Sequence, residues 1–217
     1  MRVVAIDGAA GTGKSTLAER LARHLALPYV NTGLMYRALA AAALRQGVAP
    51  DDERALLEIA EGLRFFVRIE PVGALEVQGY EMTELMSIEV ESTVSIAASH
   101  AAVRSSMRRE QRALGEANGA VMEGRDIASA VFPDAPVKLY LRAPSSLRAE
   151  RRAAQRDDGR LDEVATALEA RDDIDAITNP HEPAPGAVVI DTSDIDPDGT
   201  FDAALAVIRT RAPELLP

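Results

Sequence analysis

Short apolar runs alternate with longer amphipathic segments along most of this chain. The run at 3–6 has no polar position, which is typical of a strand buried on both faces of a parallel sheet. The segment at 15–27 instead repeats leucine and alanine at helical spacing and ends at Pro28. By the same patterns, further strands are predicted at 29–31, 120–122, 137–141 and 187–191, and further helices at 34–46, 51–62, 103–116, 144–156, 161–173 and 199–212. Strands separated by helices predict an α/β fold with a five-stranded, doubly wound parallel sheet.

The alternation is interrupted between residues 63 and 100. Two short apolar runs, at 65–69 and 74–77, flank the sequence Pro71-Val72-Gly73, which indicates a β-hairpin. Residues 81–99 then show weaker helical patterns. We therefore interpret 63–100 as a small insert, with a short antiparallel sheet and helices, inside a single domain that spans 1–217.

Composition and charge exclude several classes of protein. The chain has no cysteine, which excludes a disulfide scaffold and a cysteine-based metal site. No run approaches the 18 or so apolar residues of a membrane span, and Asp7 comes too early for a signal peptide, so we expect a cytoplasmic protein. The formal net charge of −10 argues against nucleic acid or an anionic membrane as the main partner.

The cations are unevenly divided, since only Lys14 and Lys138 among the 24 basic residues are lysines. A GC-rich coding bias would explain most of the arginines. Arginines that clamp phosphate groups would explain some of them, because the planar guanidinium binds phosphate in a bidentate manner.

A glycine-rich turn follows the first predicted strand and precedes the first predicted helix. It matches the pattern G-x-x-x-x-G-K-[ST], in the strand–turn–helix context that this phosphate-binding loop requires. Its backbone N–H groups would surround a polyphosphate, Lys14 would reach the β- and γ-phosphates, and Ser15 would bind Mg²⁺. The candidate ATP-binding residues are Gly8, Ala9, Ala10, Gly11, Thr12, Gly13, Lys14, Ser15 and Thr16.

The loop predicts nucleotide binding and leaves the reaction open. A GTPase would carry an Asn-Lys-x-Asp motif, whereas Lys138 lies in Val-Lys-Leu-Tyr. A transport ATPase would have a signature loop and a much longer chain. A small kinase or an ATP-driven regulator remains.

Two other strand-to-helix turns carry candidate acceptor-site residues. Thr32, Tyr36 and Arg37 follow the second predicted strand, and the arginine can face the edge of the sheet where ligands bind. The alternative is that Thr32 caps the next helix and Arg37 is solvated.

The turn after the strand at 120–122 reads Glu123-Gly124-Arg125-Asp126. Here Glu123 can orient the water shell of Mg²⁺ and Arg125 can clamp a second phosphate. The alternative is a surface turn with a local ion pair.

Together these motifs resemble those of bacterial cytidylate kinases, which are nucleoside monophosphate kinases with a P-loop. The resemblance covers essentially the whole chain and rests on the loop at 7–16, on Thr32-Gly33 with Tyr36-Arg37, on Glu123-Gly124-Arg125-Asp126, and on Val131-Phe132-Pro133-Asp134-Ala135-Pro136-Val137-Lys138. It implies Mg²⁺-dependent transfer of the γ-phosphate of ATP to CMP or dCMP. It also implies that 63–100 binds the nucleoside monophosphate and that 144–160 forms a lid. We expect a monomer whose partners are these small nucleotides.

The resemblance also implies roles for single residues. Lys14, Arg37, Arg125 and Arg171 would be catalytic. The CMP-binding residues would be Thr32, Tyr36, Arg37, Ser95, Arg104, Arg125, Asp126, Arg171 and Asp175. Ser95 and Arg104 would read the cytosine ring with help from Asp126, because the ring has two acceptors and a donating amine.

The chain departs from the family pattern at two places. Many members continue Asp-Ser-x-Arg where this chain has Asp175-Ala176-Ile177-Thr178, so a hydroxyl and a second arginine are missing. Glu123 stands where the family often has aspartate, and it keeps a carboxylate for the metal site.

Four arginines in the predicted lid lie near one helical face, and they can close over the transferring phosphates. They are Arg148, Arg151, Arg152 and Arg156. The alternative is a solvated face paired with Glu150, Asp157 and Asp158.

Two other functions also remain open. One is a different small-molecule P-loop kinase, acting on UMP and CMP, shikimate or dephospho-coenzyme A, and the other is a nucleotide sensor without catalysis.

Overall fold

The computed structural model describes the chain apart from residues 69–72, 157–160 and 180–181, and it also leaves out the side chains of residues 155, 156 and 161. The five predicted strands form one parallel sheet in the order β2-β5-β1-β6-β7. They are β1 (Val3–Gly8), β2 (Tyr29–Asn31), β5 (Ala120–Gly124), β6 (Val137–Arg142) and β7 (Val188–Asp191). The predicted α/β fold is therefore confirmed.

The predicted helices are present with small shifts of their ends. They are α1 (Lys14–Leu25), α2 (Thr32–Gln46), α3 (Glu53–Gly62), α6 (Ala101–Asn118), α7 (Ser145–Arg156), α8 (Leu161–Thr178) and α9 (Pro197–Arg211). The largest shift is in α8, which was predicted to end at residue 173. Two short helices were not predicted, the π-helix η1 (Ile127–Val131) and the 3₁₀-helix η2 (Pro213–Leu215).

The central strand β1 is buried on both faces, as its unbroken apolar run predicts. Val3 and Ala5 belong to the hydrophobic cluster that includes residues of α2, α3, α5 and α6. Val4 and Ile6 belong to the cluster on the other face, with α1 and α9. Because side chains alternate along a strand, both faces need apolar residues and no polar position is left.

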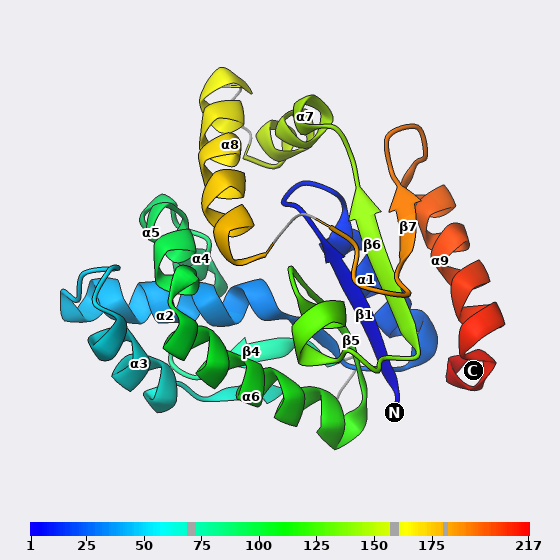
Figure 1. Cartoon of the computed structure of the whole chain (residues 1–217), viewed down its shortest axis with the longest axis horizontal. Helices are drawn as coiled ribbons and strands as arrows, with labels where there is room; N and C mark the ends of the chain where they lie inside the picture. Colours follow the sequence, from blue (N-terminus) through cyan, green and yellow to red (C-terminus); the bar gives the residue numbers. More distant parts are fainter. Residues whose placement is uncertain (69–72, 157–160, 180–181) are drawn as a thin grey trace.

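The segment at 63–100 forms a hairpin followed by two helices. Strands β3 (Phe65–Val67) and β4 (Leu75–Val77) are antiparallel, and α4 (Met82–Leu85) and α5 (Ile88–Ser99) follow. The hairpin joins the edge of the main sheet, where the Tyr29 N–H donates to the Gly73 carbonyl at 2.7 Å. In Figure 1, α4 and α5 lie on the opposite side of the molecule from α9.

The carboxyl ends of the strands point towards α7 and α8, as Figure 1 shows. Ligands of open parallel sheets bind at this edge. The roles of 63–100 as an insert and of 144–160 as a lid stay predictions. Within the described part of the chain, no helix is both long and apolar enough to cross a membrane.

The start of the π-helix η1 is fixed by hydrogen bonds to a residue that is distant in sequence, so no local sequence pattern predicts it. Both carboxylate oxygens of Asp7, at the end of β1, accept backbone N–H bonds of 2.8 Å, from Ile127 and Ala128. Asp7 is buried, and burial raises the pKa of its carboxyl group to about 6. The turn that carries Arg125 and Asp126 is thereby fixed to the strand that leads into the phosphate loop.

Candidate active site

The predicted phosphate loop joins β1 to α1, and its backbone requires glycine. Gly13 precedes α1 with φ of 92°, a left-handed conformation that side chains disfavour. Gly11 has φ of 78°, and a Cβ atom there would lie 2.8 Å from the Arg148 carbonyl oxygen. The first turn of α1 contains no acidic residue, so its positive dipole end is available to an anion.

The side chain of Lys14 is folded back onto the phosphate loop. Its Nζ donates to the Ala9 carbonyl at 2.7 Å, and the Thr12 hydroxyl donates to the same oxygen at 2.9 Å. Burial, with a smaller contribution from the Arg125 guanidinium, lowers the pKa of Lys14 to about 7. A bound polyphosphate would supply the negative charge that keeps this lysine protonated.

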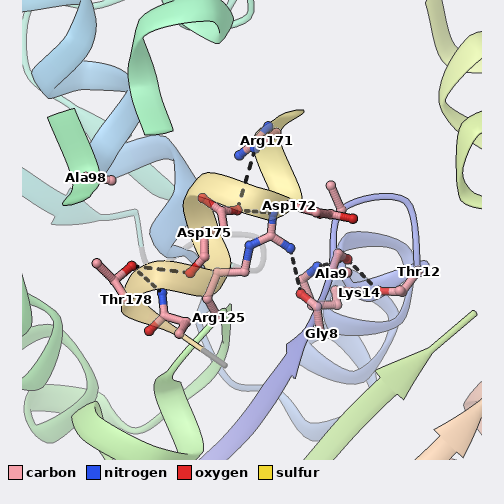
Figure 2. A network of polar contacts seen from close by, with 12 residues as sticks. Gly8, Ala9, Thr12, Lys14, Ala98, Arg125, Arg171, Asp172, Asp175 and Thr178 are labelled. Carbon is pink, nitrogen blue, oxygen red and sulfur yellow. Dashed lines mark hydrogen bonds and ion pairs between the residues drawn. The ribbon is translucent and has the colours of Figure 1, made fainter. Parts of the chain in front are cut away.

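Arg125 connects the phosphate loop to α8 (Figure 2). Its Nη1 donates to the Gly8 carbonyl at 2.7 Å, and its Nη2 lies 2.8 Å from Asp175 Oδ2. The same oxygen of Asp175 is 3.8 Å from Arg171 Nε. Two predicted catalytic arginines therefore share one carboxylate beside the loop.

Three arginines from three helices also surround Glu91, on α5. Glu91 Oε1 lies 2.8 Å from Arg152 Nη2, 3.7 Å from Arg37 Nη2 and 3.7 Å from Arg171 Nη1. Burial and the neighbouring Arg125 lower the pKa of Arg171 to about 10. The guanidinium groups of these three arginines can bind anionic oxygen atoms. In this structure they surround an oxygen of the Glu91 carboxylate.

The other arginines of the predicted lid that have described side chains bind to groups of the protein itself. Arg148 is buried, donates to the Ala10 carbonyl at 3.2 Å and pairs with Asp172 at 2.7 Å. Arg151 donates to the Thr192 hydroxyl and carbonyl at 3.0 and 2.7 Å. These side chains therefore do not form a solvated face. The side chain of Arg156 lies outside the described residues, as do Asp157 and Asp158 entirely.

The residues predicted to read cytosine line one cavity together. Arg104 Nη2 donates to Asp126 Oδ2 at 2.8 Å. Arg108 donates to that oxygen twice, at 3.0 and 2.7 Å. The hydroxyl oxygen of Ser95 is buried without a hydrogen-bond partner in the described structure. Since buried polar atoms are nearly always paired, this hydroxyl indicates a place for a polar ligand.

For the two acceptor turns, the alternatives of a helix cap with a solvated arginine and of a surface turn are wrong. Asn31, rather than Thr32, occupies the cap position of α2, and the Thr32 hydroxyl donates to the Glu123 carbonyl at 2.7 Å. Arg37 is buried and donates to the Leu85 carbonyl at 3.0 Å, so it is not solvated. Glu123 is also buried and accepts a bond from the Tyr29 hydroxyl, so it does not lie on a surface turn.

One cavity of about 200 Å³ brings most of these groups together. The predicted residues that line it are Ala10, Gly11, Lys14, Ser15, Thr32, Tyr36, Arg37, Ser95, Arg104, Glu123, Arg125, Asp126, Arg152, Arg171 and Asp175. The predicted residues with described side chains that are not in this lining are Gly8, Ala9, Thr12, Gly13, Thr16, Arg148 and Arg151.

Sequence reasoning missed four residues that shape the site. Arg108 was recoverable, because it lies one helical turn after Arg104 and shares its face. Tyr29, Glu91 and Asn179 had no local signal, since each acts through a contact with a residue distant in sequence.

A glycine loop between β1 and α1, with an arginine-lined cavity at the carboxyl edge of a parallel sheet, defines a P-loop kinase. The family model for cytidylate kinase matches residues 4–210 of this chain. The cytidylate kinase of Chloroflexus aggregans is 42% identical over 206 residues, covering 90% of this chain and 89% of the relative. That of Roseiflexus castenholzii is 40% identical over 221 residues, covering 96% and 94%. The chain belongs to the cytidylate kinase family.

Proposed function

We propose that this protein transfers the γ-phosphate of ATP to CMP or dCMP, giving ADP and CDP or dCDP. The observation that carries the proposal is one cavity that is lined both by Lys14 of the phosphate loop and by Ser95, Arg104 and Asp126. The phosphate loop suits a triphosphate, and the other three residues offer donors and a carboxylate to a pyrimidine base.

The geometry of Asp126 favours cytosine over uracil. All three hydrogen bonds of its carboxylate within the described structure end on Oδ2, so Oδ1 is left to accept a bond from a ligand. The exocyclic amine of cytosine can donate to that oxygen. Uracil has a carbonyl at the same position, and two acceptors facing each other would repel.

The chemistry needs positioning and positive charge more than it needs a base. The attacking oxygen of the CMP phosphate is already anionic at pH 7. Lys14, Arg37, Arg125 and Arg171 would hold the reacting phosphates in line and stabilise the charge of the transition state. Arg152 also lines the cavity, so it is the lid arginine with a described side chain that is best placed to assist them.

Mg²⁺ fits the oxygen atoms that line the cavity. Ser15 and Glu123 both line it, and the described residues contain no group of three His, Asp or Glu side chains suited to hold a metal alone. Mg²⁺ commonly binds through one or two protein oxygens, substrate phosphates and water. We expect the Ser15 hydroxyl to bind the ion and the Glu123 carboxylate to hold its water. The ion would neutralise phosphate charge.

A coupled assay of ADP release with a panel of acceptors tests the proposal. At saturating ATP and Mg²⁺, CMP and dCMP should give fast turnover. Equal or faster turnover with UMP alone, shikimate or dephospho-coenzyme A would point to another P-loop kinase. Tight binding of ATP and CMP without ADP release would point to a nucleotide sensor.

We further propose that the protein acts as a monomer in the cytoplasm. The cavity already contains donor-site and acceptor-site residues of one chain, so no second copy is needed to complete it. Light scattering of the full chain tests the oligomeric state, and a dimer mass at micromolar concentration would contradict it.

A further inference from the structure

We propose that Asn179 is a positioning residue, which sets the base specificity of the acceptor site by fixing the Arg104 guanidinium. Asn179 directly follows α8, and its backbone N–H donates to the Asp175 carbonyl at 2.8 Å. The position of Asn179 is therefore set by the end of the helix that also carries Arg171. The inference rests on the function proposed above.

The side chain of Asn179 contacts Arg104 inside the protein. Asn179 Oδ1 accepts a hydrogen bond of 2.7 Å from Arg104 Nη2, and both residues are buried and line the cavity. A guanidinium has only donors, so the amide must present its oxygen to it. Asn179 accepts this bond without adding a second negative charge beside Asp126.

The contacts of Arg104 use a defined part of its five N–H groups. Nη2 donates one hydrogen to Asp126 Oδ2 and the other to Asn179 Oδ1. Nη1 donates one hydrogen to the Ala98 carbonyl at 3.2 Å. Within the described residues, one N–H of Nη1 and the N–H of Nε remain. They point to different sides of the planar guanidinium, so one of them can donate to an acceptor of cytosine, O2 or N3.

The hydrogen bond to Asn179 also keeps Arg104 from binding both carboxylate oxygens of Asp126. Arg104 reaches this carboxylate through one N–H, because Asn179 accepts the second hydrogen of Nη2. Without that acceptor, a buried N–H would lose its partner, which is unfavourable. Arg104 would then turn to a bidentate pair with Asp126, the geometry that guanidinium and carboxylate groups prefer.

A bidentate pair would occupy Asp126 Oδ1, the oxygen that we assign to the amine of cytosine. CMP would lose an acceptor for its amine and the aligned Arg104 donor for its O2 or N3. UMP, which has no amine, would lose less. Asn179 therefore supports discrimination between the two bases without contacting either.

Steady-state kinetics of the full-length protein with CMP, UMP and ATP test this role. Asn179→Leu keeps the branching at Cγ and removes the acceptor, and Asn179→Asp keeps an oxygen for Arg104. Asn118→Leu, at the exposed end of the same helix as Arg104, is the matched control. For Asn179→Leu we expect the KM for CMP to rise roughly tenfold, the effect of losing one hydrogen bond to a charged group. We expect kcat and the KM for ATP to stay within about twofold of wild type, by the same comparison.

The preference for CMP over UMP in kcat/KM should fall with Asn179→Leu and stay near the wild-type value with Asn179→Asp and Asn118→Leu. An unchanged preference in Asn179→Leu, or an equal loss with both nucleotides, would overturn the inference. So would an Asn118→Leu variant that loses the preference equally. If Asn179→Leu does not fold, Asn179→Ala replaces it with the same expected results. Wild-type protein that phosphorylates neither CMP nor dCMP would instead overturn the proposed function, before any variant is compared.

Discussion

Lys14 is the residue whose charge depends most directly on what the phosphate loop holds. Burial and Arg125 lower its pKa to about 7, so a large share of empty molecules carries a neutral amine at neutral pH. The anionic oxygens of ATP would raise that pKa again. ATP binding and protonation of Lys14 are therefore coupled.

We expect ATP–Mg²⁺ binding at pH 7.5 to take up a substantial fraction of a proton from solution. Titration calorimetry in two buffers with different enthalpies of ionisation measures this uptake. It should shrink as the pH is lowered to 6, where Lys14 is already charged in the empty loop. Release of protons, or the same uptake by a Lys14→Met variant, would contradict the account.

At the scale of elements, Glu91 on α5 contacts arginines of α2, α7 and α8. The carboxylate of Glu91 lies among arginines that the phosphate of CMP would also need. We predict that Glu91→Gln lowers the KM for CMP about fivefold, because removing a like charge of this kind is worth about 1 kcal/mol. Glu89→Gln, exposed on the same helix, is the control and should change little. A higher KM in Glu91→Gln would show that Glu91 instead supports the bound state.

Asp7 joins two elements, β1 and η1, through two backbone N–H groups. In Asp7→Asn, the amide can accept only one of these bonds, and its own N–H₂ group faces the other donor. We expect a loss of about 1–3 kcal/mol in the free energy of unfolding at pH 7, measured by urea denaturation. An unchanged stability would show that the turn at 125–126 does not depend on this anchor.

The difference in the free energy of unfolding between wild type and Asp7→Asn should change with pH. Because the pKa of Asp7 is raised to about 6, the folded state binds more protons at this carboxyl than the unfolded state between about pH 4 and 6. The contribution of Asp7 to stability therefore increases as the pH falls through 6, and the gap between wild type and Asp7→Asn should widen. A gap that narrows over this range would contradict the shift.

The elements and the phosphate loop could be predicted because their signals are local. The apolar run of β1 and the spacing from Gly8 to Ser15 can each be found within a few residues of sequence. The π-helix η1 could not be predicted, because Asp7 fixes its start from far away in the chain. Glu91 and Asn179 could not be predicted for the same reason. Their contacts exist only once α5 and α8 have packed beside the loop.

At the scale of the whole molecule, an acidic protein holds two anionic substrates. The net charge is −10, yet Lys14, Arg37, Arg125, Arg152 and Arg171 all line one cavity. The overall field therefore does not attract the nucleotides, and the local arrangement of cations must bind them. A coding bias as the source of most of the arginines is compatible with this use of a few.

The central claim is that the protein phosphorylates a cytosine nucleotide in this cavity. The most direct test is kcat/KM of the purified protein for CMP, dCMP and UMP at saturating ATP and Mg²⁺. The account predicts that CMP and dCMP exceed UMP by at least about tenfold, because Asp126 accepts the amine that only cytosine has. Equal values for CMP and UMP, or no turnover of either cytosine nucleotide, would contradict it.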